Sequence, residues 1–251
     1  MAARPEINQA VIFAGGRGER LRPLTDRLPK PMAPVYGRPF LDYLLQTLMD
    51  TGIMSAVILA GYRADIIMDR YKDGLRNGFK VRYSIGSVDN LTGRRVLDAY
   101  NLLEDEFLLM YGDNYWPIEM ARMLAHYGQK QVPAMTTVFS NTQGSAEYGF
   151  ENNVRVENGM VKRYDKKRQA PSLNGVDIGY FVLRKDILDQ GISGNISFEE
   201  DVLARMARQG RLAAHVTDRQ YYYITSFATL KNFEAAVTEH QFKPLDENLL
   251  K

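Results

Sequence analysis

The sequence predicts an α/β protein with a three-layer αβα architecture, in which a mixed, mostly parallel central sheet lies between two layers of helices. Short apolar runs rich in β-branched residues alternate with amphipathic segments of helical spacing, a pattern typical of parallel sheets covered on both faces. Hairpin signals in the second half indicate that antiparallel pairing enters there. The chain has 251 residues, and no linker, repeat or low-complexity segment divides it. We therefore expect a single domain, residues 1–251.

The first half of the chain carries the clearest alternation of strands and helices. Residues 10–14 (AVIFA) form an apolar run that stops at Gly15-Gly16, which predicts a buried strand entering a glycine loop. The apolar spacing then predicts further strands at 55–60, 80–85 and 106–111, and helices at 40–50, 64–71, 94–103 and 118–127.

The second half should complete the same mixed sheet. Glu157-Asn158-Gly159 predicts a hairpin turn within residues 152–164. The other elements expected here are strands at 134–139, 177–183 and 212–217 and a helix at 198–209.

Composition excludes several classes of function. The 32 basic and 30 acidic residues leave a formal charge of +2, which lacks the basic excess of a general nucleic-acid binder. The chain has no cysteine and only three scattered histidines, so it offers neither a disulfide framework nor a thiolate or histidine-rich metal centre. No secretory h-region and no apolar stretch of about 20 residues is present. We expect a cytoplasmic protein that does not associate with a membrane.

The segment AGGRGERLRPLTDRLPKPMAP, residues 14–34, is the strongest candidate for binding phosphate. Its glycines allow close backbone approach, so that successive N–H groups can surround a triphosphate, while its cations supply compensating charge. Lys30 stands between two prolines, which should hold its backbone extended. A glycine turn alone would equally fit a tight turn without a ligand. The candidate nucleotide-binding residues of this segment are Ala14, Gly15, Gly16, Arg17 and Gly18, and the candidate catalytic residues are Arg20 and Lys30.

Asp113 follows the predicted strand at 106–111, where open α/β sheets place their ligands. A helix N-cap is the alternative interpretation of this aspartate. Trp116, the only tryptophan, could line a pocket, but core packing is the simpler expectation for a large aromatic residue.

The motifs GGRGERL and PKPMAPVYGRPFLDY together resemble the signature of sugar-1-phosphate nucleotidyltransferases, and in detail the D-glycero-D-manno-heptose 1-phosphate guanylyltransferase-like members. The resemblance implies a Rossmann-like nucleotide-diphospho-sugar transferase fold. It also implies a second glycine loop at Thr92 and Gly93 near the base and sugar, and Mg²⁺ on Asp113. The sugar-phosphate residues that it implies are Tyr148, Gly149, Asp165 and Lys166.

The chain departs from this family pattern at Thr225, Asp165 and Arg94. Thr225 stands where most members have a second metal-binding aspartate, so Asp177 is a candidate substitute ligand for Mg²⁺. A sugar-hydroxyl contact is an equally good interpretation of Asp177. Asp165 replaces the usual glutamate, and Arg94 replaces a small residue, where it either reaches the substrate or is solvated.

The reaction implied by the resemblance joins a nucleoside triphosphate to a sugar 1-phosphate and releases pyrophosphate. GTP with D-glycero-D-manno-heptose 1-phosphate is the favoured pair. The alternatives are another NTP or hexose 1-phosphate, or a nucleotide-sugar-binding protein without turnover. The glycine loop lacks the GxGxxG form of dehydrogenases and the GK[ST] ending of P-loop kinases, which argues against both. The sequence is also compatible with a homo-oligomer.

Overall fold

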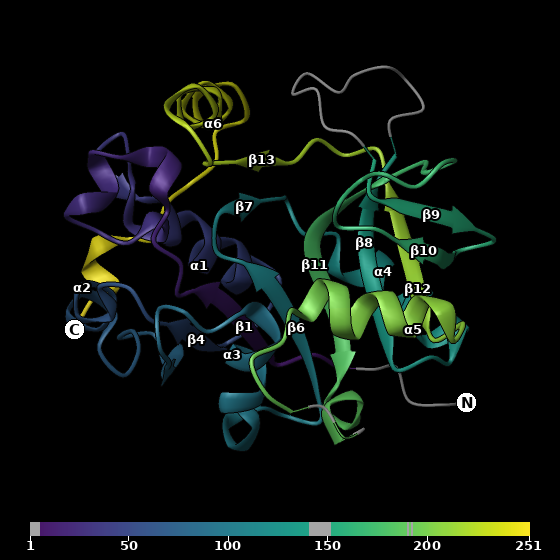
Figure 1. Ribbon diagram of the computed structural model, residues 1–251. Helices are drawn as coiled ribbons and strands as arrows, with labels where there is room; N and C mark the ends of the chain where they lie inside the picture. Colours follow the sequence, from purple (N-terminus) through teal and green to yellow (C-terminus); the bar gives the residue numbers. More distant parts are fainter. Residues whose placement is uncertain (1–5, 141–151, 190, 192) are drawn as a thin grey trace.

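The computed structural model describes residues 6–140, 152–189, 191 and 193–251. Its centre is a nine-stranded sheet in the order β5-β4-β1-β6-β11-β8-β12-β10-β9 (Figure 1). All strands except β10 and β11 run in the same direction. The bounds in sheet order are β5 Lys80–Ile85, β4 Ser55–Ala60, β1 Gln9–Ala14, β6 Glu106–Tyr111, β11 Val176–Arg184, β8 Ala134–Phe139, β12 Leu212–Thr217, β10 Met160–Tyr164 and β9 Val154–Glu157.

Helices cover both faces of this sheet, as the alternation of apolar segments predicts. One apolar layer contains Ile12 of β1 with Leu44 of α1 and Phe233 of α6, and the other contains Val11 of β1 with Val96 of α3. Successive residues of β1 therefore point into opposite layers, which is why the strand is apolar throughout. The helices are α1 Phe40–Asp50, α2 Ala64–Tyr71, α3 Thr92–Asp98, α4 Met120–Lys130, α5 Ala204–Arg208 and α6 Phe227–His240. The three-layer, mostly parallel fold is confirmed.

Helix boundaries differ from the sequence-based prediction where distant chain segments decide them. α3 begins at Thr92, two residues earlier than predicted, because the Gly93 and Arg94 N–H groups donate to the Ile196 carbonyl (2.9 and 3.2 Å). A remote carbonyl thus satisfies N–H groups that have no partner in the first turn of a helix. The helix predicted at 198–209 begins as a π-helical turn, Phe198–Leu203, before α5.

The long connection between β1 and α1 is built from short turns. It contains three 3₁₀ turns, Glu19–Leu21, Leu24–Asp26 and Lys30–Met32, and the hairpin of β2 (Pro34–Val35) and β3 (Arg38–Pro39). The expectation of extended backbone at Lys30 is therefore wrong. Lys30 opens a 3₁₀ turn closed by the Met32 N–H on the Pro29 carbonyl (2.8 Å), which Pro31 tolerates because its missing N–H falls in the first turn.

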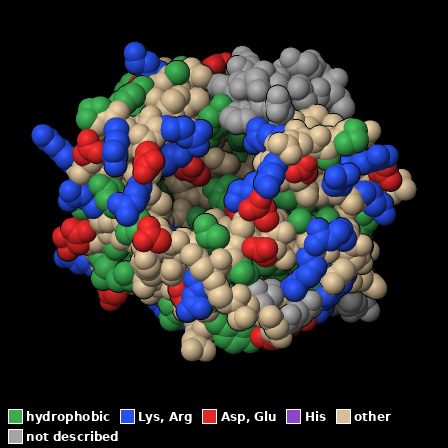
Figure 2. Space-filling model, viewed as in Figure 1, with side chains coloured by type: hydrophobic (Ala, Val, Ile, Leu, Met, Phe, Trp, Pro, Cys, Tyr) green, Lys and Arg blue, Asp and Glu red, His purple; other side chains and the backbone are tan. Residues whose placement is uncertain are grey.

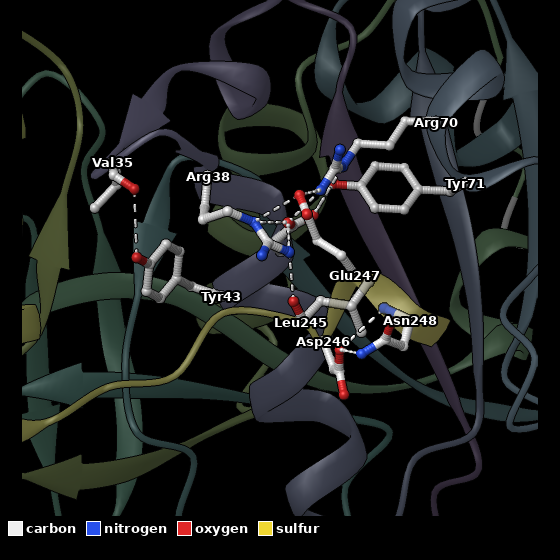
Figure 3. Close-up of polar contacts among 10 residues, drawn as sticks. Val35, Arg38, Tyr43, Arg70, Tyr71, Leu245, Asp246, Glu247 and Asn248 are labelled. Carbon is white, nitrogen blue, oxygen red and sulfur yellow. Dashed lines mark hydrogen bonds and ion pairs between the residues drawn. The ribbon is translucent and has the colours of Figure 1, made fainter. Parts of the chain in front are cut away.

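A network of polar contacts joins the C-terminal segment to α1 and α2 (Figure 3). Asp42 of α1 is fully buried and accepts hydrogen bonds from Arg38, from Arg70 of α2 and from the Tyr71 hydroxyl (2.6 Å). Arg38 also donates to the Leu245 carbonyl (2.5 Å). We call Asp42, Arg38, Arg70 and Tyr71 the Asp42 cluster.

Among the described helices, none combines the length and the apolar character that crossing a membrane requires.

Candidate active site

A cleft of about 820 Å³ opens at the carboxyl ends of β1 and β6. Figure 2 shows this face of the molecule hollowed near its centre, with Lys and Arg side chains around the hollow. Ligands of open α/β sheets bind at such strand ends. The predicted site residues that line the cleft are Ala14, Gly15, Gly16, Arg17, Gly18, Arg20, Lys30, Thr92, Asp113, Lys166 and Asp177.

Two groups of predicted residues are not among those lining it. Gly93 lies in the first turn of the helix α3 rather than in a glycine loop, and Asp165 lies in the loop after β10; neither lines the cleft. Tyr148 and Gly149 lie outside the described residues.

The segment that carries Lys30 packs against the glycine loop after β1. Gly18 has a φ of 65°, in the left-handed region that favours glycine, and an added Cβ would lie 3.0 Å from the Lys30 Cβ. The Thr25 hydroxyl donates to the Gly18 carbonyl (2.9 Å). Arg17 is about half exposed and lies 3.7 Å from Asp89. The loop and Lys30 are therefore positioned together.

Lys30 meets Asp113 and Thr225 in the cleft. The Lys30 Nζ donates to Asp113 Oδ2 and to Thr225 Oγ1, the latter at 3.3 Å. The Ile224 N–H donates to the Asp113 carbonyl (3.0 Å), which fixes the Thr225 segment beside the aspartate. The Lys30 side chain is only 14% exposed, so its ammonium is positioned rather than solvated. Three residues far apart in sequence thus form one polar group.

Asp177 of β11 lies in the cleft wall with three hydrogen-bond donors around it. It accepts from Thr136 Oγ1 (2.8 Å), from the Tyr164 hydroxyl (2.5 Å) and from the Gly179 N–H (2.9 Å). Burial raises the pKa of Asp177 to about 6, although these donors act in the opposite direction. Its oxygens are therefore largely committed to protein partners.

The raised pKa predicts a measurable pH dependence of stability. Since folding raises the pKa of Asp177 from 3.8 to about 6, its contribution to stability is fully present below about pH 4 and is lost as pH rises through about 6. Asp177→Asn cannot ionise, so it does not lose this contribution as pH rises. Its free energy of unfolding relative to that of wild type should therefore be higher at pH 7.5 than at about pH 4, by roughly 2–3 kcal/mol. Urea unfolding at both pH values measures the gain; an equal difference at both would contradict it.

No sequence motif pointed to Glu199, which connects several parts of the cleft. Its carboxylate accepts from Thr92 Oγ1 (2.7 Å), from the Tyr111 hydroxyl (2.6 Å) and from Ser197 Oγ (2.8 Å), and Lys166 Nζ lies 3.2 Å away. Burial opposes its ionisation, but Lys166 and the donated hydrogen bonds outweigh burial and keep the pKa of Glu199 below its usual value. Glu199 therefore connects the start of α3 to Lys166.

Asp165 organises the loop that carries Lys166. Its carboxylate accepts from the backbone N–H groups of Lys167 (3.0 Å), Gln169 (3.0 Å) and Ala170 (2.7 Å). Hydrogen bonds from Ala170, Gln169 and Lys167 hold the pKa of Asp165 below its usual value. In this arrangement Asp165 shapes the loop, and Lys166 reaches the cleft.

Three further sequence candidates have structural partners. Gly93 packs against Ile196, whose Cγ1 would lie 2.7 Å from an added Cβ. Arg94 forms an ion pair with Asp98 at 2.8 Å. Trp116 is fully buried and packs edge-on against Tyr180, so the core-packing interpretation holds for it.

Residues 9–224 match the Nucleotidyl transferase family. The chain belongs to this family. Its nucleotidyltransferase relatives include a Bacillus subtilis protein named "Probable glucose-1-phosphate cytidylyltransferase", 28% identical over 246 residues that cover 89% of this chain and 92% of that protein. The D-glycero-alpha-D-manno-heptose 1-phosphate guanylyltransferase of Campylobacter jejuni is 27% identical over 76% of this chain and 83% of that protein.

Solved structures agree on the fold of this nucleotidyltransferase. HddC from Yersinia pseudotuberculosis complexed with GMP-PN superposes with a TM-score of 0.73 at 22% identity, covering 92% of this chain and 99% of that chain. The UTP-bound UGPase of Acinetobacter baumannii gives a TM-score of 0.76 at 18% identity, covering 92% and 93%.

The acidic groups of the cleft fit a metal held mainly by substrate phosphates. The described part of the chain brings no three acidic or histidine side chains together as a preformed metal cage. Asp113 is one-third exposed, and only its Oδ2 is engaged by Lys30. Magnesium commonly binds one or two carboxylates and completes its octahedron with waters and phosphates. Asp113 alone therefore provides a suitable protein ligand in a nucleotidyltransferase.

Proposed function

We propose that this nucleotidyltransferase uses GTP and a manno-configured heptose 1-phosphate, with Mg²⁺ bound by Asp113. The observation that carries the catalytic part is the convergence of Lys30, Asp113 and Thr225 beside the glycine loop, with Lys166 in the same cleft. The substrate pair is supported by the heptose 1-phosphate guanylyltransferases among the relatives, from Campylobacter jejuni and from Aneurinibacillus thermoaerophilus.

The reaction needs positioning and charge more than proton transfer. An oxygen of the sugar 1-phosphate attacks the α-phosphorus of the nucleotide, the new P–O bond forms, and the bond to the bridging oxygen breaks to release pyrophosphate. The attacking phosphate is already anionic, so no base has to remove a proton. Holding two polyanions in line and neutralising the charge that develops therefore account for the catalysis.

Three cations of the cleft have distinct tasks in this proposal. The N–H groups of the glycine loop and Arg20 hold the triphosphate, and Lys30 neutralises charge near the α-phosphate. Lys166, whose side chain is 47% exposed, is available to hold the sugar phosphate. When bound, Mg²⁺ supplies further charge neutralisation at the phosphates.

The metal assignment predicts different behaviour for the two aspartates. Asp113→Asn should lose magnesium-dependent turnover by at least about 10²-fold, because it removes the proposed ligand. Asp177→Asn should keep the wild-type magnesium requirement, because the Asp177 oxygens are bound by Thr136, Tyr164 and Gly179. Magnesium titrations of turnover measure both. A raised magnesium requirement in Asp177→Asn would make Asp177 a ligand instead.

The substrate pair is tested by competition. GTP, CTP, UTP and dTTP are each offered with heptose, mannose and glucose 1-phosphates, and pyrophosphate and the nucleotide sugar are measured. GTP with the manno-heptose should be preferred. Mannose 1-phosphate should be a poorer substrate but still a substrate, since it lacks only the terminal carbon and its hydroxyl. The gluco epimer should be rejected more strongly, since it leaves buried polar groups unpaired. The Bacillus subtilis relative favours a second candidate, CTP with glucose 1-phosphate, and a preference for that pair would replace the first.

A further inference from the structure

A buried arginine lies against the glycine loop, and the mechanism above gives it no task. Arg95 of α3 is 6% exposed and contributes to the cleft wall. Its Nη1 donates to the Ala60 carbonyl (3.2 Å), and its Nη2 lies within hydrogen-bond distance of the carbonyls of Gly15 (3.2 Å), Ser87 (3.0 Å) and Val88 (3.1 Å). These carbonyls stand at the carboxyl ends of β1, β4 and β5, which are neighbours in the sheet. One guanidinium thus connects three strand ends.

Two glycines make room for this guanidinium. A Cβ added to Gly15 would lie 2.1 Å from Arg95 Nη1 and 2.4 Å from its Cζ, and one added to Gly61 would lie 2.8 Å from Nη1. Neither glycine has a positive φ. Lack of space, rather than backbone conformation, therefore explains glycine at both positions: the guanidinium occupies the space at Gly15, and at Gly61 the Gly15 carbonyl oxygen (2.9 Å) lies close as well.

The contact with Gly15 also sets the direction of the next peptide group. The Gly15 carbonyl accepts from Arg95 and from the Tyr62 N–H (3.2 Å). In a trans peptide the N–H points opposite to the carbonyl, so these two donors fix the direction of the Gly16 N–H. Among the described residues the Gly16 N–H has no protein acceptor, and Gly16 lines the cleft. This N–H is available to an oxygen of a ligand.

The charge of Arg95 has no direct counter-ion in the described part of the chain. All four of its hydrogen bonds go to backbone carbonyls, and Asp98 acts on it only through a longer-range attraction. Burial lowers the pKa of Arg95, but a guanidinium stays protonated at neutral pH. A buried charge without a counter-ion is unfavourable, and an anion bound nearby reduces that cost. The carbonyl dipoles hold the cation in place but do not cancel its net charge, so this charge can still attract an anionic ligand.

We propose that Arg95 is a positioning residue of the nucleotide site, which aims the Gly15–Gly16 peptide at the triphosphate and places a fixed positive charge behind the glycine loop. The inference rests on the proposed function only in naming the ligand as a nucleoside triphosphate. Arg95 acts through the loop and its electrostatic field, so its loss should weaken triphosphate binding and leave sugar-phosphate binding intact.

Kinetics and direct binding test the charge. Arg95→Met should raise the KM for the NTP at least about tenfold and change the KM for the sugar 1-phosphate less than about twofold, while Arg95→Lys should recover part of the loss. Arg208→Met, an exposed arginine on α5, is the matched control and should behave as wild type. A thermal melt reports the folded fraction. Equal increases in both KM values, or a lower melting temperature with unchanged constants, would overturn the proposal.

A double-mutant cycle tests the contact with Gly15. The Cβ of Gly15→Ala would overlap the guanidinium, so this change should reduce kcat/KM for the NTP strongly. In an Arg95→Ala background the factor by which the same change reduces kcat/KM should be at least about tenfold smaller. Equal losses in both backgrounds would overturn the proposal.

Calorimetric titration of each of the four NTPs separates this inference from the proposed function. If wild type binds an NTP and Arg95→Met binds it equally well, only the role of Arg95 fails. If wild type binds no NTP, both fail.

Discussion

Replacing Lys30 with methionine is expected to lower kcat/KM by at least about 10²-fold while the melting temperature stays within about 2 °C of wild type. The Lys30 Nζ is the cation that contacts Asp113 and Thr225, and methionine keeps most of the side-chain length without the charge. Asp113 is one-third exposed, so water can solvate its carboxylate after the lysine is lost, and the fold should tolerate the change.

Matched measurements make the Lys30 result specific. Lys162→Met changes an exposed lysine of β10 and should leave kcat/KM unaltered. Steady-state rates and thermal melts are measured for wild type, Lys30→Met and Lys162→Met. If Lys30→Met kept half of the wild-type activity, Lys30 would have no central role in charge neutralisation.

Replacing Asp42 with alanine is expected to destabilise the protein by about 3–5 kcal/mol, because it leaves the guanidinium groups of Arg38 and Arg70 without their buried partner. Asp42 is fully buried, whereas Glu247, the other carboxylate near these arginines, is 63% exposed and lies 3.4 and 3.8 Å from them (Figure 3). Glu247 can therefore replace only a small part of the lost interaction. For a chain of this size the loss corresponds to a fall in melting temperature of roughly 6–20 °C.

The control for Asp42 is on the neighbouring helix. Asp69→Ala removes an exposed carboxylate of α2 and should shift the melting temperature by less than about 2 °C. Since the Asp42 cluster lies outside the cleft, the Asp42→Ala protein that remains folded should have wild-type KM values. A melting temperature near that of wild type would mean that the cluster contributes little to stability.

Local periodicity predicted much of the fold. The apolar spacing placed α1 at 40–50, β4 at 55–60 and β6 at 106–111, all as the structure has them. These elements are buried on one face or on both, so their patterns are strong. The boundaries of α3 and α5 could not be predicted in this way, because α3 begins where the Ile196 carbonyl accepts from its first turn.

The candidate site was predictable only in part, for the same physical reason. Glycines and cations in one segment predicted that the glycine loop would line a cleft, and the strand end predicted Asp113 beside it. Glu199 and Arg95 carry no local signal, because their environments are created by contacts over 107 residues to Thr92 and 80 residues to Gly15. The glycine at position 15 was predicted for close approach of phosphate, and the structure adds the Arg95 guanidinium as a reason for it.

Phosphorus NMR of the purified protein with Mg²⁺, GTP and a manno-heptose 1-phosphate tests the proposed reaction most directly. The GTP signals should disappear as pyrophosphate and one nucleotide diphosphate sugar appear in equal amounts, and omitting the sugar phosphate should stop the conversion. Binding of nucleotide without pyrophosphate release, for every NTP and sugar phosphate of the competition panel, would contradict the proposed reaction.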